Sequence, residues 1–210
     1  MRTYVYVDGF NLYYGALKNT PYKWLDLRAL FARILRPQNK IERIKYYTAR
    51  VSARPDDPDA PTWQDIYLRA LQLCIPELSV IEGRFLRKQV KMRLAKPIAG
   101  KQFADVIKTE EKGSDVNLAV HLVNDGWQNR YDCAVVCSND GDLSEAVRIV
   151  RRELHKTVLL AVPGDPAQRP PSVELKRWAS YTIQIKPDVF AAAQLPNPIP
   201  GTTLHKPADW

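Results

Sequence analysis

Apolar residues recur along the chain in two patterns, as short continuous runs and as runs with helical spacing. The short runs are typical of strands, and apolar positions three and four residues apart predict amphipathic helices. Strands are expected at residues 3–7, 44–51, 78–86, 133–137, 157–162 and 181–185. Helices are expected at residues 12–17, 26–35, 63–74, 113–126, 140–154 and 173–179.

Strands that alternate with helices predict an α/β fold of three layers, α/β/α, with a central and mostly parallel sheet. The continuously apolar run Cys-Ala-Val-Val-Cys at residues 133–137 is typical of a strand buried in the middle of such a sheet. We expect one domain over residues 1–185, with a basic insertion at about 84–111. The proline-rich residues 186–210 are expected to form a tail that packs loosely or not at all.

Composition narrows the class of protein. A chain of 210 residues with a hydrophobic fraction of 45% can bury a substantial core and is not a disordered sequence. No apolar run reaches the roughly 20 residues that span a bilayer, and because the apolar run at residues 3–7 is short we expect no secretory signal. Three cysteines without a C-x-x-C spacing predict reduced thiols, so we expect a cytoplasmic protein without a membrane partner.

Positive charge is concentrated in one segment. The chain has 31 basic and 23 acidic side chains, and residues 84–101 hold seven basic residues and no acidic one. Apolar and basic positions alternate there with a period of two, as in a strand, which favours a nucleic acid over a membrane surface as partner. A solvated hairpin or flexible loop is the alternative. The residues expected to contact nucleic acid are Arg84, Arg87, Lys88, Lys91, Arg93 and Lys112.

Carboxylates cluster where the predicted strands end. Asp8 ends the first strand, Asp140 and Asp142 follow the strand at 133–137, and Asp115 lies in the first turn of a helix. Ligands of open parallel sheets bind at this edge. Each aspartate could instead serve only a turn or a helix cap. Together they would repel one another unless a cation neutralised them, and their oxygen atoms suit Mg²⁺ or Mn²⁺.

Other activities of this fold class have less support. The chain has no G-x-x-x-x-G-K-[ST] loop, no G-x-G-x-x-G after the first strand and no G-x-S-x-G motif. A phosphatase that uses Asp8 as its nucleophile is a remaining alternative, although no partner acid and phosphate-binding lysine can be assigned to it.

Three segments carry a family resemblance: Tyr-Val-Asp8-Gly-Phe-Asn11-Leu, Lys112-Gly-Ser-Asp115-Val-Asn, and Ser138-Asn-Asp140-Gly-Asp142-Leu. In order and spacing they resemble the motifs of the NYN domain, a family that includes the LabA-like proteins and belongs to the PIN-like nuclease superfamily. The resemblance runs over about residues 3–162. It implies a PIN-like sheet flanked by helices and metal-dependent cleavage of RNA.

On that resemblance, the four aspartates are the expected metal ligands or activate water. Asn11 would hold Asp8 or a substrate phosphate, and Ser138 would orient the neighbouring carboxylates. The leading hypothesis is therefore an RNA-hydrolysing enzyme that uses Mg²⁺ or Mn²⁺, with single-stranded DNA as an open second substrate. A non-catalytic RNA-binding regulatory module of the same fold is the alternative, and exposed apolar helix faces are compatible with a homodimer.

Overall fold

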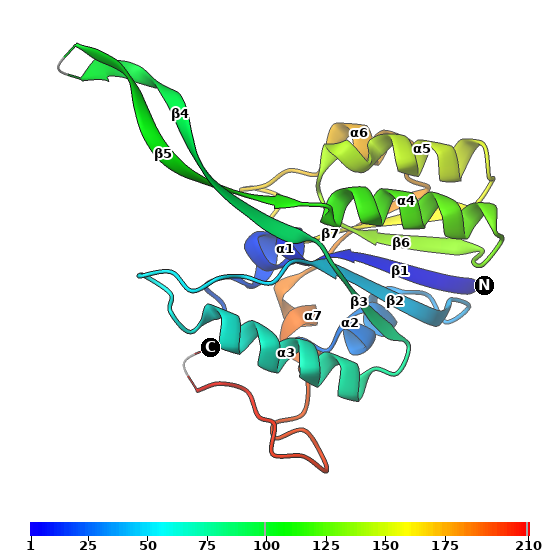
Figure 1. Ribbon diagram of the computed structural model, residues 1–210. Coiled ribbons are helices and arrows are strands. Elements are labelled where there is room, and N and C mark those ends of the chain that lie inside the picture. The colour runs from blue at the N-terminus through cyan, green and yellow to red at the C-terminus, as the bar shows by residue number, and fades with distance from the viewer. Residues whose placement is uncertain (99, 209) are drawn as a thin grey trace.

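A computed structural model describes residues 1–98, 100–208 and 210. Its centre is a sheet of six parallel strands in the order β3-β2-β1-β6-β7-β8. The strands are β1 (Arg2–Asp8), β2 (Lys40–Thr48), β3 (Leu78–Glu82), β6 (Cys133–Cys137), β7 (Thr157–Val162) and β8 (Tyr181–Gln184). The predicted three-layer α/β/α fold is confirmed (Figure 1).

The two strands in the middle of the sheet, β1 and β6, are neighbours in space but far apart in the sequence. Val5 of β1 is paired with Ile44 of β2 on one side and with Val135 of β6 on the other. The chain first builds the sheet outward from β1 through β2 to β3, and later outward from β6 through β7 to β8. The direction of winding therefore changes between β1 and β6, and in open α/β sheets the ligand crevice lies at such a switch point.

Helices cover both faces of this sheet. On one face lie α2 (Leu27–Ile34), α3 (Ala60–Cys74) and α7 (Pro187–Ala192); on the other lie α4 (Ser114–Trp127), α5 (Ser144–Arg152) and α6 (Val173–Trp178) (Figure 1). Two apolar cores result, one on each side of the sheet. In the part of the chain that the structure describes, no helix has the length and hydropathy needed to cross a bilayer.

Several predicted boundaries differ from the observed ones. Residues after β1 form a short helix, α1 (Gly9–Leu12), and a π-helical turn, η1 (Tyr13–Leu17). The single helix predicted at 140–154 is a 3₁₀ turn, η2 (Gly141–Leu143), followed by α5. The Asp140 carboxylate caps this turn by accepting the N–H of Asp142, so the chain turns tightly before the α-helix begins.

The basic segment is a hairpin, and most of its side chains are exposed to solvent. Its strands, β4 (Arg84–Ile98) and β5 (Lys101–Lys112), form an antiparallel two-stranded sheet that projects away from the central sheet (Figure 1). The single strand predicted at 78–86 is divided at Gly83: β3 ends at Glu82, and β4 begins at Arg84.

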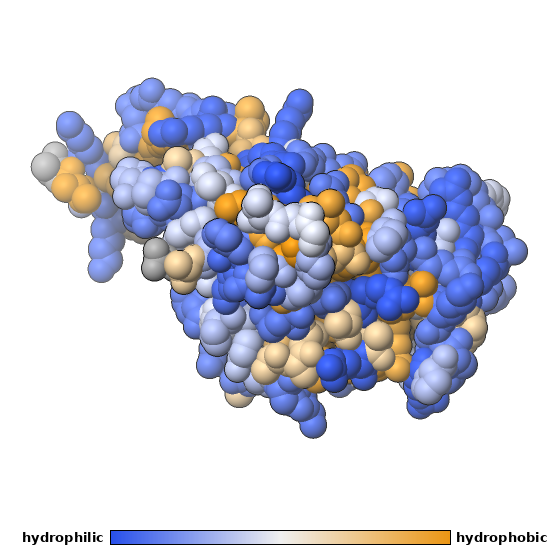
Figure 2. All heavy atoms as spheres, turned by 90° about the horizontal axis from the view of Figure 1, so that it is seen from below, coloured by the Kyte–Doolittle hydropathy of each residue, from blue (hydrophilic) through white to orange (hydrophobic). Residues whose placement is uncertain are grey.

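The expectation that residues 186–210 pack loosely was wrong. Phe190, Leu195 and Ile199 are 3%, 4% and 3% exposed and belong to the core beneath α2 and α3. The Trp24 indole also donates a hydrogen bond to the carbonyl of Pro196. Seen from below relative to Figure 1, the surface is mostly hydrophilic, with apolar residues gathered near the middle of the face (Figure 2). The many prolines shape this segment without preventing its apolar side chains from being buried.

Candidate active site

Asp8 is held in a fixed position at the end of β1. One carboxylate oxygen, Oδ1, accepts the backbone N–H of Asn11 at 2.9 Å and so caps α1. The other, Oδ2, accepts the hydroxyl of Ser138 at 2.9 Å. Asp8 is 5% exposed, and this burial raises the pKa of its carboxyl above the ordinary value, although both hydrogen bonds oppose the rise.

Ser138 connects Asp8 with the loop that follows β6. Its hydroxyl oxygen accepts the backbone N–H of Asp140 at 3.1 Å while donating to Asp8. The side chain of Asn11 adds a second link, because its Oδ1 accepts the N–H of Asn139 at 3.0 Å. Asn139 in turn donates to the carbonyl of Pro170 at 2.9 Å, which holds the loop after β7 beside the same edge.

Asp115 comes from the helical layer that covers one face of the sheet, in the first turn of α4. Its pKa is raised from the usual 3.8 to about 6, mainly by burial and further by the negative charges of Asp8, Asp140, Glu111 and Asp142. This mutual effect indicates that the carboxylates from three separate segments gather at one place.

These groups line one open cavity of about 430 Å³. Its polar walls come from the carboxylates of Asp8, Asp115, Asp140 and Glu111 and from the guanidinium groups of Arg54 and Arg169; its other lining residues are Phe10, Asn11, Tyr14, Phe85 and Ser114. An acidic centre flanked by two cationic side chains is suited to an anionic ligand whose charge is bridged to the carboxylates by a cation.

Asp142 does not line this cavity. It is exposed, and its backbone N–H donates to the carboxylate of Asp140. Its negative charge still contributes to the raised pKa of Asp115. Sequence reasoning missed Glu111, Arg54 and Arg169. The only signal for Glu111 is its position three residues before Ser114, whose N–H it accepts at 3.1 Å at the start of α4. The two arginines lie in loops whose course the pattern of residues does not predict.

The donor chemistry of the cavity fits a hard divalent cation, since carboxylate oxygens are the preferred ligands of Mg²⁺ and Mn²⁺. Across residues 1–98, 100–208 and 210, no three acidic, histidine or cysteine side chains lie close enough together to hold a metal ion directly. The fit is therefore to an ion that keeps several of its waters, as Mg²⁺ commonly does, and not to an all-protein cage.

The register of the hairpin sorts its basic residues onto two faces. Because side chains alternate along a strand, Arg87, Lys91 and Arg93 share a face with Phe85, which lines the acidic cavity. Arg84 and Lys88 lie on the other face with their cross-strand partners Lys112 and Lys108. Both of those lysines are ion-paired with Glu110, at 3.5 and 2.5 Å. The six expected nucleic-acid contacts are thus divided between the two faces, three on the face that carries Phe85 and three on the other.

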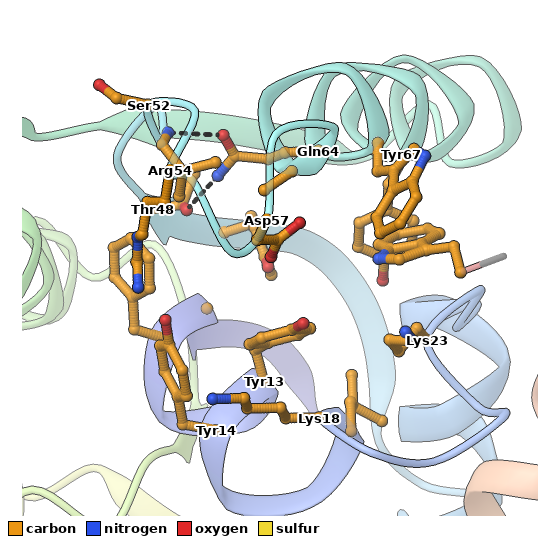
Figure 3. Close-up of a pocket in the computed structure, with 18 of the residues that line it drawn as sticks. Tyr13, Tyr14, Lys18, Lys23, Thr48, Ser52, Arg54, Asp57, Gln64 and Tyr67 are labelled. Carbon is orange, nitrogen blue, oxygen red and sulfur yellow. Dashed lines mark hydrogen bonds between the residues drawn. The ribbon is translucent and has the colours of Figure 1, made fainter. Parts of the chain in front are cut away.

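A second cavity, of about 310 Å³, adjoins the first between η1 and α3. Seven aromatic residues contribute to its walls, with Tyr13 and Tyr14 opposite Gln64 and Tyr67 (Figure 3), and charged residues of both signs, among them Lys18 and Asp57, complete the lining. Phe10, Tyr14 and Arg54 line both cavities, so the two share a wall.

Comparison with known proteins gives the family of the chain. The model of the NYN domain matches residues 2–186. The chain belongs to the NYN domain family. The suspected family is therefore confirmed, together with the nuclease-like fold that the NYN domain implies.

This NYN protein is similar to one curated protein in sequence and to one solved structure in fold. 6-Hydroxy-3-succinoylpyridine 3-monooxygenase HspA from Pseudomonas putida (strain DSM 28022 / S16) is 32% identical, over 100% of this chain and 75% of that protein. A crystal structure of the protein of unknown function VPA0982 from Vibrio parahaemolyticus RIMD 2210633 has a TM-score of 0.56 at 19% identity, over 89% of this chain and 94% of that one. The second likeness supports the fold alone.

Proposed function

We propose that this NYN protein is a metal-dependent ribonuclease. The observation that carries the proposal is the convergence of Asp8, Asp115 and Asp140 on one cavity at the switch point of a parallel sheet. Carboxylates that lie close enough to disfavour one another's charge gain most from a cation, which favours a metal-binding role over separate capping roles.

Asp8, Asp115 and Asp140 would hold Mg²⁺ or Mn²⁺ in this proposal, in part through its waters, and Asp142 would contribute its nearby negative charge. A bound divalent ion supplies activation of water and stabilisation of negative charge on a phosphodiester. Asp8 is oriented by the Asn11 N–H and the Ser138 hydroxyl, and both hydrogen bonds favour its ionised form. Arg54 and Arg169 lie where they can neutralise phosphate oxygens at the cavity. Hydrolysis would break the bond between phosphorus and the 3′ oxygen, leaving a 5′-phosphate and a 3′-hydroxyl.

The hairpin supplies the contacts for a longer substrate. Arg87, Lys91 and Arg93 project from the face that leads to Phe85 and the cavity. A polynucleotide held along this face would be positioned through its phosphates, with little dependence on base sequence.

The test is cleavage of end-labelled RNA and of single-stranded DNA with Mn²⁺, with Mg²⁺ and with EDTA. The purified protein is compared with Asp140→Asn, which keeps an oxygen able to cap η2, and with Asp188→Asn, an exposed aspartate in α7, as matched control. Metal-dependent cutting that is lost only in Asp140→Asn is the expected result. Salt-sensitive RNA binding without cutting would favour the regulatory module, and a trapped phosphoryl group on Asp8 would favour the phosphatase.

One observation supports a second candidate, oxygenation of a substituted hydroxypyridine. The similar protein named as a 6-hydroxy-3-succinoylpyridine 3-monooxygenase aligns with the whole chain, and the aromatic cavity is of a size that suits a small ring. Such a reaction consumes O₂ and a two-electron reductant. Oxygen uptake that depends on both NADH and a hydroxypyridine acid, and that persists in Asp140→Asn, would favour it over the ribonuclease.

A further inference from the structure

The aromatic cavity between η1 and α3 is built as a rigid site. The Tyr67 hydroxyl donates to the carbonyl of Leu25 at 2.9 Å, which fixes its ring. The Gln64 amide is held on both sides, donating to the carbonyl of Ala49 and accepting the N–H of Val51, each at 2.9 Å. Walls that are already hydrogen-bonded elsewhere need little reorganisation when a ligand enters, which favours binding.

The walls of the cavity favour a flat ring as ligand. Its walls include Tyr13, Tyr14, Trp63, Tyr67 and Trp210, and planar rings stack well on such side chains. Charges of both signs lie at the same walls: the Lys18 ammonium is 5.0 Å from the centre of the Tyr14 ring and Lys23 6.0 Å from that of Trp210, and Asp56 and Asp57 also line the cavity. A volume of about 310 Å³ accommodates one small ring system with its substituents.

A line of aromatic rings connects this cavity with the acidic one and with the hairpin. Phe85 at the base of β4 contacts Phe10 at 5.7 Å between ring centres, Phe10 stacks on Tyr14 at 6.4 Å, and Tyr14 contacts Tyr13 at 5.2 Å. Arg54, beside Tyr14, lines both cavities. A ligand that places an anionic group near the aspartates can therefore place an attached ring among the aromatic walls.

We infer that the aromatic cavity binds one unpaired nucleobase, that of the nucleotide next to the phosphate held at the aspartates. The identity of the ligand rests on the proposed ribonuclease function. A base can stack among these walls only when it is unstacked from its neighbours and released from a pairing partner. The inference thus assigns the enzyme a single-stranded substrate, with the paired duplex excluded by the shape of the site.

Binding can be measured without metal or cleavage, by calorimetric titration in EDTA. The probes are uridine 5′-monophosphate, ribose 5-phosphate, which lacks the base, and 6-hydroxynicotinate, a small aromatic acid. Trp63→Ala removes one wall of the cavity, and Trp127→Ala, at a side chain that is 76% exposed on α4, is its matched control. If Trp63→Ala folds poorly, Tyr13→Leu tests the opposite wall instead. We expect the nucleotide to bind at least about tenfold more tightly than ribose 5-phosphate, and Trp63→Ala to weaken its binding by about tenfold with no change in Trp127→Ala.

Equal binding of the nucleotide and ribose 5-phosphate, or binding that neither Trp63→Ala nor Tyr13→Leu alters, would overturn the inference. Binding of 6-hydroxynicotinate without binding of the nucleotide would also overturn it, in favour of a small aromatic acid. The ribonuclease proposal fails separately: tight, Trp63-dependent nucleotide binding without any RNA cutting retains the base site and refutes the nuclease. Cutting of RNA without base-dependent binding retains the nuclease and refutes the base site.

Discussion

The side-chain oxygen of Asn11 accepts the backbone N–H of Asn139 at 3.0 Å, although 128 residues separate the two. The N–H of Asn11 is at the same time bound to the carboxylate of Asp8. A single side chain thus joins the end of β1 to the loop after β6, across the point where the sheet changes its direction of winding. The relative placement of Asp8 and Asp140 depends on this bond and on the bridge through Ser138.

Substitution Asn11→Ala should lower the rate of RNA cleavage without weakening RNA binding, because it changes the placement of the carboxylates and leaves the basic hairpin intact. The unpaired N–H of Asn139 should also cost about 1–3 kcal/mol of unfolding free energy. Cleavage kinetics, RNA affinity in EDTA and urea unfolding would check both effects. Asn124→Ala, at an exposed site on α4, is the control, and a loss of affinity equal to the loss of rate would contradict the positioning role.

The raised pKa of Asp115, about 6 in place of 3.8, predicts a pH dependence of stability in the metal-free protein. The folded state binds this proton more tightly than the unfolded state, so the free energy of unfolding should fall as the pH rises from about 4 to about 6. Asp115→Asn should remove that part of the fall and be relatively more stable at pH 7. Urea unfolding in EDTA at several pH values measures this.

The control for that experiment is Asp188→Asn, which changes an exposed carboxylate in the first turn of α7. Mn²⁺ should stabilise the wild type more than Asp115→Asn, because a ligand that binds only the folded state stabilises it by mass action. Parallel pH profiles of the wild type and Asp115→Asn would show that the carboxylates do not interact as the geometry implies.

The two faces of the hairpin should differ in their contribution to RNA binding. Replacing Arg87, Lys91 and Arg93 by glutamine in one variant removes three positive charges from the hairpin face that carries Phe85. The slope of log affinity against log salt should fall by about 2, since each contacted phosphate of a single strand contributes about 0.7. Fluorescence anisotropy across a salt series measures the slope.

The matched control removes the same number of charges from the opposite face, with glutamine at Arg84, Lys88 and Lys108. Its salt slope should change by less than half as much, because Lys108 is already paired with Glu110 and this face is turned away from Phe85. Equal losses from the two faces would show that the hairpin attracts RNA only through its total charge.

The C-terminal segment should contribute strongly to stability. Phe190 is 3% exposed within the core beneath α2, so Phe190→Ala should lower the unfolding free energy by about 3–5 kcal/mol. Thr203→Ala, at an exposed position of the same segment, should change it by less than about 0.5 kcal/mol. A negligible effect of Phe190→Ala would support the loosely packed tail that the prolines suggested.

The sequence by itself determined the class of fold and the family. Alternating strand and helix patterns are local properties, set by which side chains must leave water, and they predicted the layers and most elements to within a few residues. The motifs around Asp8, Asp115 and Asp140 are equally local. Their order and spacing sufficed to indicate the NYN domain, which the family comparison confirmed.

Only the tertiary structure decided which side chains meet. Glu111, Arg54 and Arg169 reach the acidic cavity from a hairpin and two loops, and the positions of loops depend on packing between distant segments and not on residue periodicity. The same holds for the burial of Phe190, since its partners lie far away in sequence, and for the division of the hairpin charges, since a register shift of one residue would exchange the faces. Local pattern specifies elements, whereas the site arises from contacts between them.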